Sequence, residues 1–168
     1  MYIKNVLAAL SIMFLLMVPC LAQEKEKVQE EQTIKQKNVP KVILSVFKKS
    51  YPKATIKGYS KETEEGKLFY EIESSEGKVN RDLIYNPDGT VVSIEETLPL
   101  SEVPEIVRTS LNKEFPKAKV LKSEKVTKGT VIQYEFVVQS GKKSSEVVID
   151  SYGKVIEKET AKKGEEKD

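Results

Sequence analysis

The stretch IYNPDGTVVSIEE, from Ile84 to Glu96, returns 64 residues later as VIDSYGKVIEKE, from Val148 to Glu159. The same offset aligns further short motifs without a gap: Val39-Pro40 with Val103-Pro104, Pro52-Lys53-Ala54 with Pro116-Lys117-Ala118, Tyr70-Glu71 with Tyr134-Glu135, and Gly77-Lys78 with Gly141-Lys142. Prolines, glycines and a Tyr-Glu pair that all keep one phase indicate a duplicated structural unit.

Each unit is predicted to begin with a helix. Apolar residues recur at three- and four-residue spacing over 39–47, and residues 103–111 repeat the pattern. The proline of each Val-Pro pair suits the first helical turn, because the N–H that it lacks has no partner there. A residue before proline avoids the helical region, so Tyr51-Pro52 and Phe115-Pro116 are expected to end the two helices.

Four short strands are predicted to follow each helix, because the apolar period changes to two. In the second strand Leu68, Tyr70 and Ile72 fall at alternate positions, matched by Ile132, Tyr134 and Phe136 in the second unit. The third strand is apolar at successive positions, so its phase stays open. NPDG and DSYG form the turn before the fourth strand, where Gly89 and Gly153 supply a positive φ. The predicted fold is α+β, with two tandem repeats, each one helix followed by a four-stranded antiparallel sheet.

One such unit is marginal as a free-standing core, which is a physical reason for two copies, joined through sheet pairing or back-to-back packing. The predicted organisation is a signal peptide (1–22), a flexible polar linker (23–38), repeat 1 (39–98), repeat 2 (99–159) and a charged tail (160–168). Cleavage is expected before Gln23, giving a periplasmic or secreted protein with no stable membrane insertion. The alternative is a lipoprotein anchored through Cys20, although Pro19 is unusual before a lipidated cysteine.

Composition excludes several classes of activity. The chain has no histidine and its single cysteine precedes the expected cleavage point, so imidazole- and thiolate-based catalysis and metal sites are absent from the mature chain. Its formal net charge is only +2 with both signs interspersed, which argues against nucleic-acid binding. Glycine-rich phosphate loops are also missing, and NPDGT lacks the glutamate of a calcium loop. We therefore expect no cofactor, no metal and no catalytic residue.

The order of these motifs, from the signal peptide through the Val-Pro helix, Pro-Lys-Ala, the Tyr-Glu strand and the D-G-x-V turn, resembles the PepSY-like family of exported bacterial proteins with a β-lactamase-inhibitor-protein-like (BLIP-like) fold. The resemblance covers nearly all of 39–159. It implies a non-enzymatic envelope module with a sheet surface for protein or peptide partners. Resemblance to the wider PepSY group implies the alternative of a protease inhibitor or chaperone-like module. The disulfides of the β-lactamase inhibitor protein have no counterpart in the expected mature chain, which has no cysteine.

The sheet face opposite the helices, called the open face below, is the predicted partner-binding surface for an envelope protein or peptide. Its expected members are Tyr59, Phe69, Glu71, Glu73, Val131, Gln133, Glu135 and Val137. An exposed aromatic and apolar cluster is typical of a partner site, but the same face would also be apolar if it packed against the other unit. A third hypothesis is an enzyme that uses Glu71 and Glu135 as paired carboxylates.

Overall fold

The computed structural model describes residues 31–160, so the predicted signal peptide and nearly all of the charged tail lie outside the described residues. The elements follow the chain as β1 (Gln32–Thr33), η1 (Gln36–Asn38), α1 (Lys41–Ser50), β2 (Thr55–Glu64), β3 (Lys67–Glu76), β4 (Val79–Tyr85), β5 (Val91–Thr97), η2 (Leu100–Glu102), α2 (Glu105–Glu114), β6 (Lys119–Lys128), β7 (Val131–Ser140), β8 (Lys143–Asp150) and β9 (Val155–Thr160). Each repeat thus contains the predicted helix and four strands in the predicted order.

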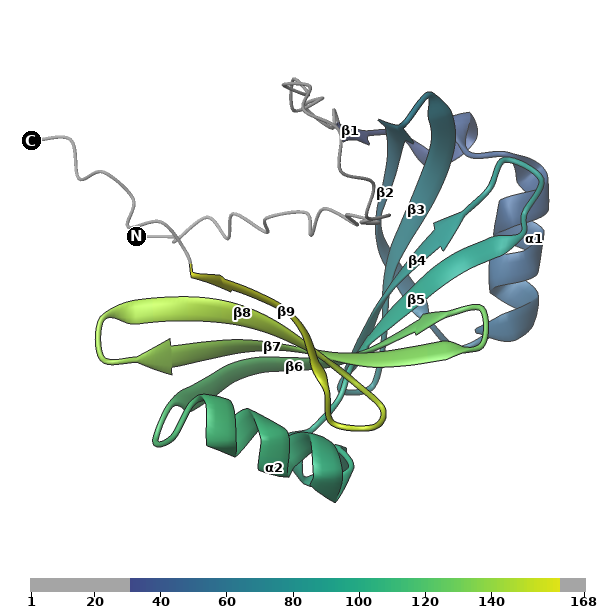
Figure 1. The fold of residues 1–168 in the computed structure, drawn as a ribbon. Helices are drawn as coiled ribbons and strands as arrows, with labels where there is room; N and C mark the ends of the chain where they lie inside the picture. The colour runs from purple at the N-terminus through teal and green to yellow at the C-terminus, as the bar shows by residue number, and fades with distance from the viewer. Residues whose placement is uncertain (1–30, 161–168) are drawn as a thin grey trace, which may run out of the picture.

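The strands form one antiparallel sheet of nine strands, in the order β1 to β9 along the chain. The expected separate four-stranded sheet for each repeat is not confirmed, because β5 pairs with β6 and joins the two sets edge to edge. Figure 1 shows the sheet turning sharply at this joint, with α1 outside the first half and α2 outside the second. The open faces of the two repeats therefore make one continuous surface on the inner side of the bend.

Each helix covers its own core. In repeat 1, Ile43 and Phe47 of α1 pack with Ile72 of β3 and with Leu83 and Tyr85 of β4. The equivalent cluster in repeat 2 is formed by Val103, Val107, Leu111, Tyr134, Phe136, Val138, Val147 and Ile149. The phase of the third strand, which the sequence left open, is thereby settled: Leu83 and Tyr85 face the helix, and the residue between them faces away.

The turns NPDG and DSYG have a second role beyond reversing the chain. Gly89 and Gly153 have φ values of +88° and +86°, which L side chains rarely adopt. A Cβ on Gly89 would lie 3.0 Å from Val42 of α1, and one on Gly153 would lie 3.0 Å from Ile106 of α2. Both turns therefore rest directly on a helix, and glycine is required by both the backbone angle and the close approach.

The prediction of a flexible linker over 23–38 is wrong for its last part. Gln32 and Thr33 form β1, which pairs with Lys61 and Ser60 of β2, and η1 comes next in the chain. This pairing reproduces, 64 residues earlier, the register of Glu96 and Thr97 on β6. The strand β1 thus occupies on β2 the place that β5 occupies on β6, and the repeat begins earlier than Val39.

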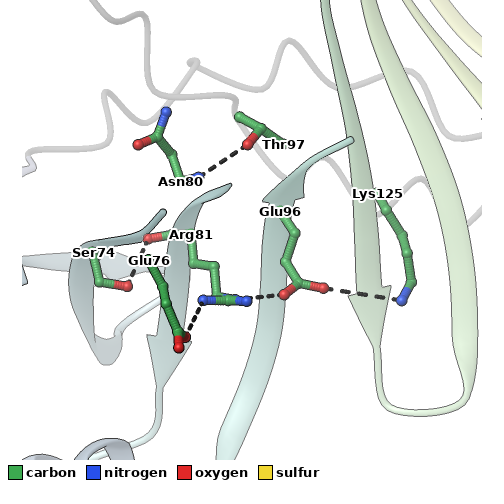
Figure 2. Close-up of polar contacts among 7 residues, drawn as sticks. All are labelled: Ser74, Glu76, Asn80, Arg81, Glu96, Thr97 and Lys125. Atoms are coloured by element: carbon green, nitrogen blue, oxygen red, sulfur yellow. Dashed lines mark hydrogen bonds and ion pairs between the residues drawn. The ribbon is translucent and has the colours of Figure 1, made fainter. Parts of the chain in front are cut away.

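An ionic network on the helix side supports the joint between the repeats (Figure 2). The Arg81 Nε donates to Glu96 Oε1 at 2.6 Å, and its Nη1 lies 3.3 Å from Glu76 Oε2. The guanidinium also lies 4.8 Å from the centre of the Tyr51 ring. Across the joint, Lys125 Nζ of β6 lies 4.0 Å from Glu96 Oε2. The network connects β3, β4, β5 and β6.

Candidate functional site

Acidic side chains gather at the middle of the open face. Residues directly opposite each other in a sheet share a face, so the register places Glu73, Asp82 and Glu95 in one row across β3, β4 and β5. A neighbouring row carries Glu124 of β6 and Glu135 of β7. We call these residues, with Glu71 of β3, the acidic cluster.

Three carboxylates of the acidic cluster meet at the joint between the repeats. Oxygen atoms of Glu95, Glu124 and Glu135 all lie within 4.8 Å of one another, and we call these three residues the acidic trio. Glu124 is only 6% exposed, and its Oε2 accepts from Lys122 Nζ at 2.8 Å. Three carboxyl groups thus share a half-buried site, and one ammonium group, that of Lys122, pairs directly with one of them.

Burial is the main reason that Glu95 and Glu135 resist ionisation. It raises the pKa of Glu95 to about 7, and repulsion from Glu135 and Glu124 adds to the effect. Burial likewise raises the pKa of Glu135 to about 7, although Lys128 opposes the shift. The desolvation comes partly from valines of this same face, since Val126 of β6 is 1% exposed and Val148 of β8 is 8% exposed.

The first repeat holds two further carboxyl groups with raised pKa values. Burial raises the pKa of Glu71 to about 7, even though the Ser60 hydroxyl donates to Glu71 Oε2 at 2.7 Å and favours the charged form. Burial and then repulsion from Glu73 raise the pKa of Asp82 to about 6. Near neutral pH the open face therefore holds several carboxyl groups close to their titration points.

Seven of the eight predicted partner-site residues lie on the open face. Phe69, Glu71 and Glu73 lie there in β3, and Val131, Gln133, Glu135 and Val137 lie there in β7. Glu71, Gln133, Glu135 and Val137 are partly buried, whereas Glu73 is exposed and Val131 is 53% exposed. The two repeats thus share this surface, and it is not buried by back-to-back packing.

The outward placement of Tyr59 is wrong. The pairing of β2 with β3 shifts register between Ile56 and Gly58, so Tyr59 lies opposite Ile72 and packs against the core beneath α1. A bulge of this kind inserts one extra residue and reverses the phase of the later strand residues. Strict alternation in the sequence predicted the opposite face. Gly58 is the local signal, because a Cβ there would lie 3.1 Å from the Glu73 carboxyl carbon.

Asp82, Glu95 and Glu124 were missed as site residues by the sequence reasoning. Asp82 was missed because the phase of its strand was open. Glu95 lies in repeat 1 and Glu124 in repeat 2, and only the pairing of β5 with β6 brings them together. No sequence signal predicted that pairing, although the alternation around Glu135 placed one member of the trio on the correct face.

The acidic trio supplies carboxylate oxygens, which are ligands both for hard metal cations and for organic cations such as ammonium and guanidinium groups. The groups Glu71 and Glu135, considered as a catalytic pair, lie on β3 and β7, with three strands between them. The carboxylate of Glu135 lies within 4.8 Å of those of Glu95 and Glu124, whereas Glu71 accepts a hydrogen bond from the Ser60 hydroxyl. The arrangement therefore favours binding of positive charge at the joint over chemistry between that pair.

Comparison with known proteins agrees with this architecture. The chain is 18% identical to a protein from Bacteroides eggerthii described as a "putative periplasmic" protein, with a TM-score of 0.62 over 73% of this chain and 88% of that one. It is 16% identical to a BLIP-like protein from Bacteroides fragilis, with a TM-score of 0.59 over 76% and 90% of the two chains. These likenesses show the fold.

No curated protein matches the chain in sequence. Among residues 31–160, no helix has the length and apolar character needed to cross a membrane. The family model described as "Putative beta-lactamase-inhibitor-like, PepSY-like" matches residues 24–93 and again residues 78–157, one match for each repeat. The chain therefore belongs to the PepSY-like family and has a BLIP-like fold built from two repeats.

Proposed function

We propose that this protein is an exported, non-enzymatic binding module of the cell envelope, whose open face binds a lysine- or arginine-bearing segment of a protein or peptide. The observation that carries the proposal is the trio of Glu95, Glu124 and Glu135 within 4.8 Å at the joint. Export is supported by the leader-like N-terminus and by the description of the Bacteroides eggerthii protein.

Electrostatics favours a cationic ligand. Carboxylates that are held together and partly removed from water repel one another, and an incoming positive charge relieves that repulsion. Lys122 already pairs with Glu124, whereas Glu95 and Glu135 have no ion pair with a cation among the described residues. One ammonium or guanidinium group between Glu95 and Glu135 would offset one of the two carboxylates that Lys122 leaves without a cation.

The surroundings of the trio suit a peptide chain. Val137 and Gln133, which flank Glu135 on the same face of β7 and are partly exposed, offer an apolar contact and an amide. An apolar centre with a few polar groups is the usual composition of a protein-binding patch.

The test is titration of the exported protein, produced from the full chain, with a blocked Lys-Gly-Lys-Gly-Lys peptide and with its glutamate counterpart. Calorimetry at low ionic strength is expected to show binding of the lysine peptide alone, weakened by salt because the contacts are charged. Glu95→Gln with Glu135→Gln is expected to weaken binding about tenfold or more. Both substitutions keep the shape of the side chain.

The matched control is Glu102→Gln with Glu105→Gln, which makes the same change in net charge at two exposed positions near α2. Equal losses in the two double variants would reduce the effect to overall charge and overturn the proposed site. Binding of the glutamate peptide, or no binding of either peptide, would overturn the cationic ligand.

A further inference from the structure

A groove separate from the open face runs between α1 and β2. It has a volume of about 520 Å³, and its walls carry Phe47 and Tyr51 from α1 and its C-terminal end, and Ile56 and Tyr59 from β2. Pro52, Ala54 and Gln36 of η1 line it as well. Its lining mixes apolar and aromatic side chains with polar ones, and its volume lies within the range of ligand sites.

One wall of the groove is a strand edge with free backbone groups. Pairing of β1 with β2 covers Ser60 and Lys61, and the Ile34 amide donates to the Tyr59 carbonyl at 2.9 Å. Among residues 31–160, no strand lies beside Thr55–Gly58 on that side. Four residues of strand span about 13 Å, so this edge offers main-chain hydrogen bonds to an added strand of about that length.

Two lysines give the groove a positive rim. Lys48 on the α1 wall and Lys57 on the β2 wall both line the groove and are exposed. The equivalent positions of repeat 2 hold Asn112 and Leu121, so this charge is particular to repeat 1.

Aromatic character also distinguishes the two repeats. Tyr59 of the groove corresponds to Ser123, whose hydroxyl is already used in a hydrogen bond to the Leu98 carbonyl. Leu44 of the groove corresponds to Arg108. A ligand for the repeat 1 groove therefore meets an apolar wall with Tyr59 and a basic rim that repeat 2 does not reproduce.

We propose that the groove between α1 and β2 binds an extended peptide segment with acidic residues flanking an apolar one, added as a strand to the Thr55–Gly58 edge. The apolar side chain of the peptide enters between Tyr51, Tyr59 and Phe47, and the acidic residues meet Lys48 and Lys57. This is strand addition beside a helix, in which backbone hydrogen bonds give affinity and the groove selects side chains. It is a second surface, opposite in charge preference to the open face.

The experiment titrates the exported protein, uniformly labelled with nitrogen-15, with the blocked peptide Glu-Val-Leu-Val-Glu and with its lysine-flanked counterpart. The glutamate peptide is expected to shift the backbone amide resonances of Thr55 to Tyr59 in a saturable manner. The lysine peptide is expected to leave those resonances unchanged. Shifts elsewhere, or no shift, with the glutamate peptide would overturn the proposal.

Two sets of variants test the contacts. Lys48→Glu with Lys57→Glu changes only exposed residues and is expected to weaken the glutamate peptide about tenfold and to admit the lysine peptide. Lys113→Glu with Lys142→Glu is the matched control and is expected to change neither affinity. Equal effects in both double variants would refute the basic rim.

Two N-methylated forms of the glutamate peptide test the added strand. Successive N–H groups of a strand point to opposite sides, so N-methylation at alternate residues blocks either the amides facing β2 or those facing away. One form is expected to lose binding and the other to keep it. Equal affinity of the two forms would show that the peptide does not pair with the β2 edge, and would overturn the proposal.

Discussion

Replacing Glu95 by glutamine is expected to stabilise the fold above neutral pH and to change little in mild acid. The folded state raises the pKa of Glu95 to about 7, mainly through burial, and then through Glu135 and Glu124. A raised carboxyl pKa means that the folded state binds its proton more tightly than the unfolded state. The stability that this proton provides is present below the unfolded pKa and is lost as pH rises through about 7.

The magnitude can be worked out from the pKa shift. A rise from 4.5 to about 7 sets an upper limit of about 3.4 kcal/mol on the cost of ionising Glu95 in the folded state. The open face still contacts water, which screens the group, so about 1–2 kcal/mol is the expected gain for Glu95→Gln. Coulomb's law gives a similar range for two charges 4.8 Å apart: about 1 kcal/mol in water and about 3.5 kcal/mol at a dielectric constant of about 20.

The assay is urea unfolding followed by far-ultraviolet circular dichroism at about pH 5 and about pH 8 in low salt. The parent protein is expected to be less stable at the higher pH, because Glu71, Asp82, Glu95 and Glu135 all have raised pKa values. Glu95→Gln should remove part of that loss, and the exposed control Glu102→Gln should not. A parent protein whose stability increases between the two pH values, or a glutamine variant destabilised at pH 8, would refute the reasoning.

Two further substitutions test the packing of the turns and the buried charge. Gly89→Ala places a side chain at φ +88° against Val42 and is expected to cost about 2–4 kcal/mol of folding stability. Gly66→Ala, at φ +79° with nothing within 4 Å, is the control and should cost only about 1 kcal/mol. Equal losses of stability in thermal unfolding would contradict the close approach of Gly89 to α1. Lys122→Met leaves Glu124 buried without its ammonium partner and is expected to cost about 1–2 kcal/mol in urea unfolding near neutral pH, and an unchanged midpoint would show that the pair does not contribute.

Local features of the fold were predictable because short-range physics decides them. Alternation in β3 and β7 placed Ile72 and Phe136 on the helix face, and the turn residues identified both hairpins before β5 and β9. The predicted outward placement of Tyr59 is wrong because one bulge residue reverses the phase of the strand, and strict alternation takes no account of an inserted residue. The order of the strands at the joint stayed open in the sequence for a different reason: pairing between repeats is a long-range choice that the local pattern of β5 does not encode.

The duplication does more than enlarge a core, because the acidic trio exists only where two units meet. Glu95 comes from the last strand of repeat 1, while Glu124 and Glu135 come from the first two strands of repeat 2. In repeat 2, the residue equivalent to Glu95 is Glu159, which lies on β9 at the outer edge of the sheet with no further unit beside it among residues 31–160. A single repeat would therefore carry the parts of this site without assembling it.

The start of the sheet shows what the same joint looks like with a different residue at its centre. There β1 lies on β2 in the register of β5 on β6, but the position equivalent to Glu124 is Ser60. Its hydroxyl donates to Glu71, the equivalent of Glu135, at 2.7 Å. A hydroxyl at this position donates a hydrogen bond to the neighbouring carboxylate, whereas a third carboxylate repels it. The different residue at equivalent positions explains why, among residues 31–160, three carboxylates meet at the joint between the repeats and not at the start of the sheet.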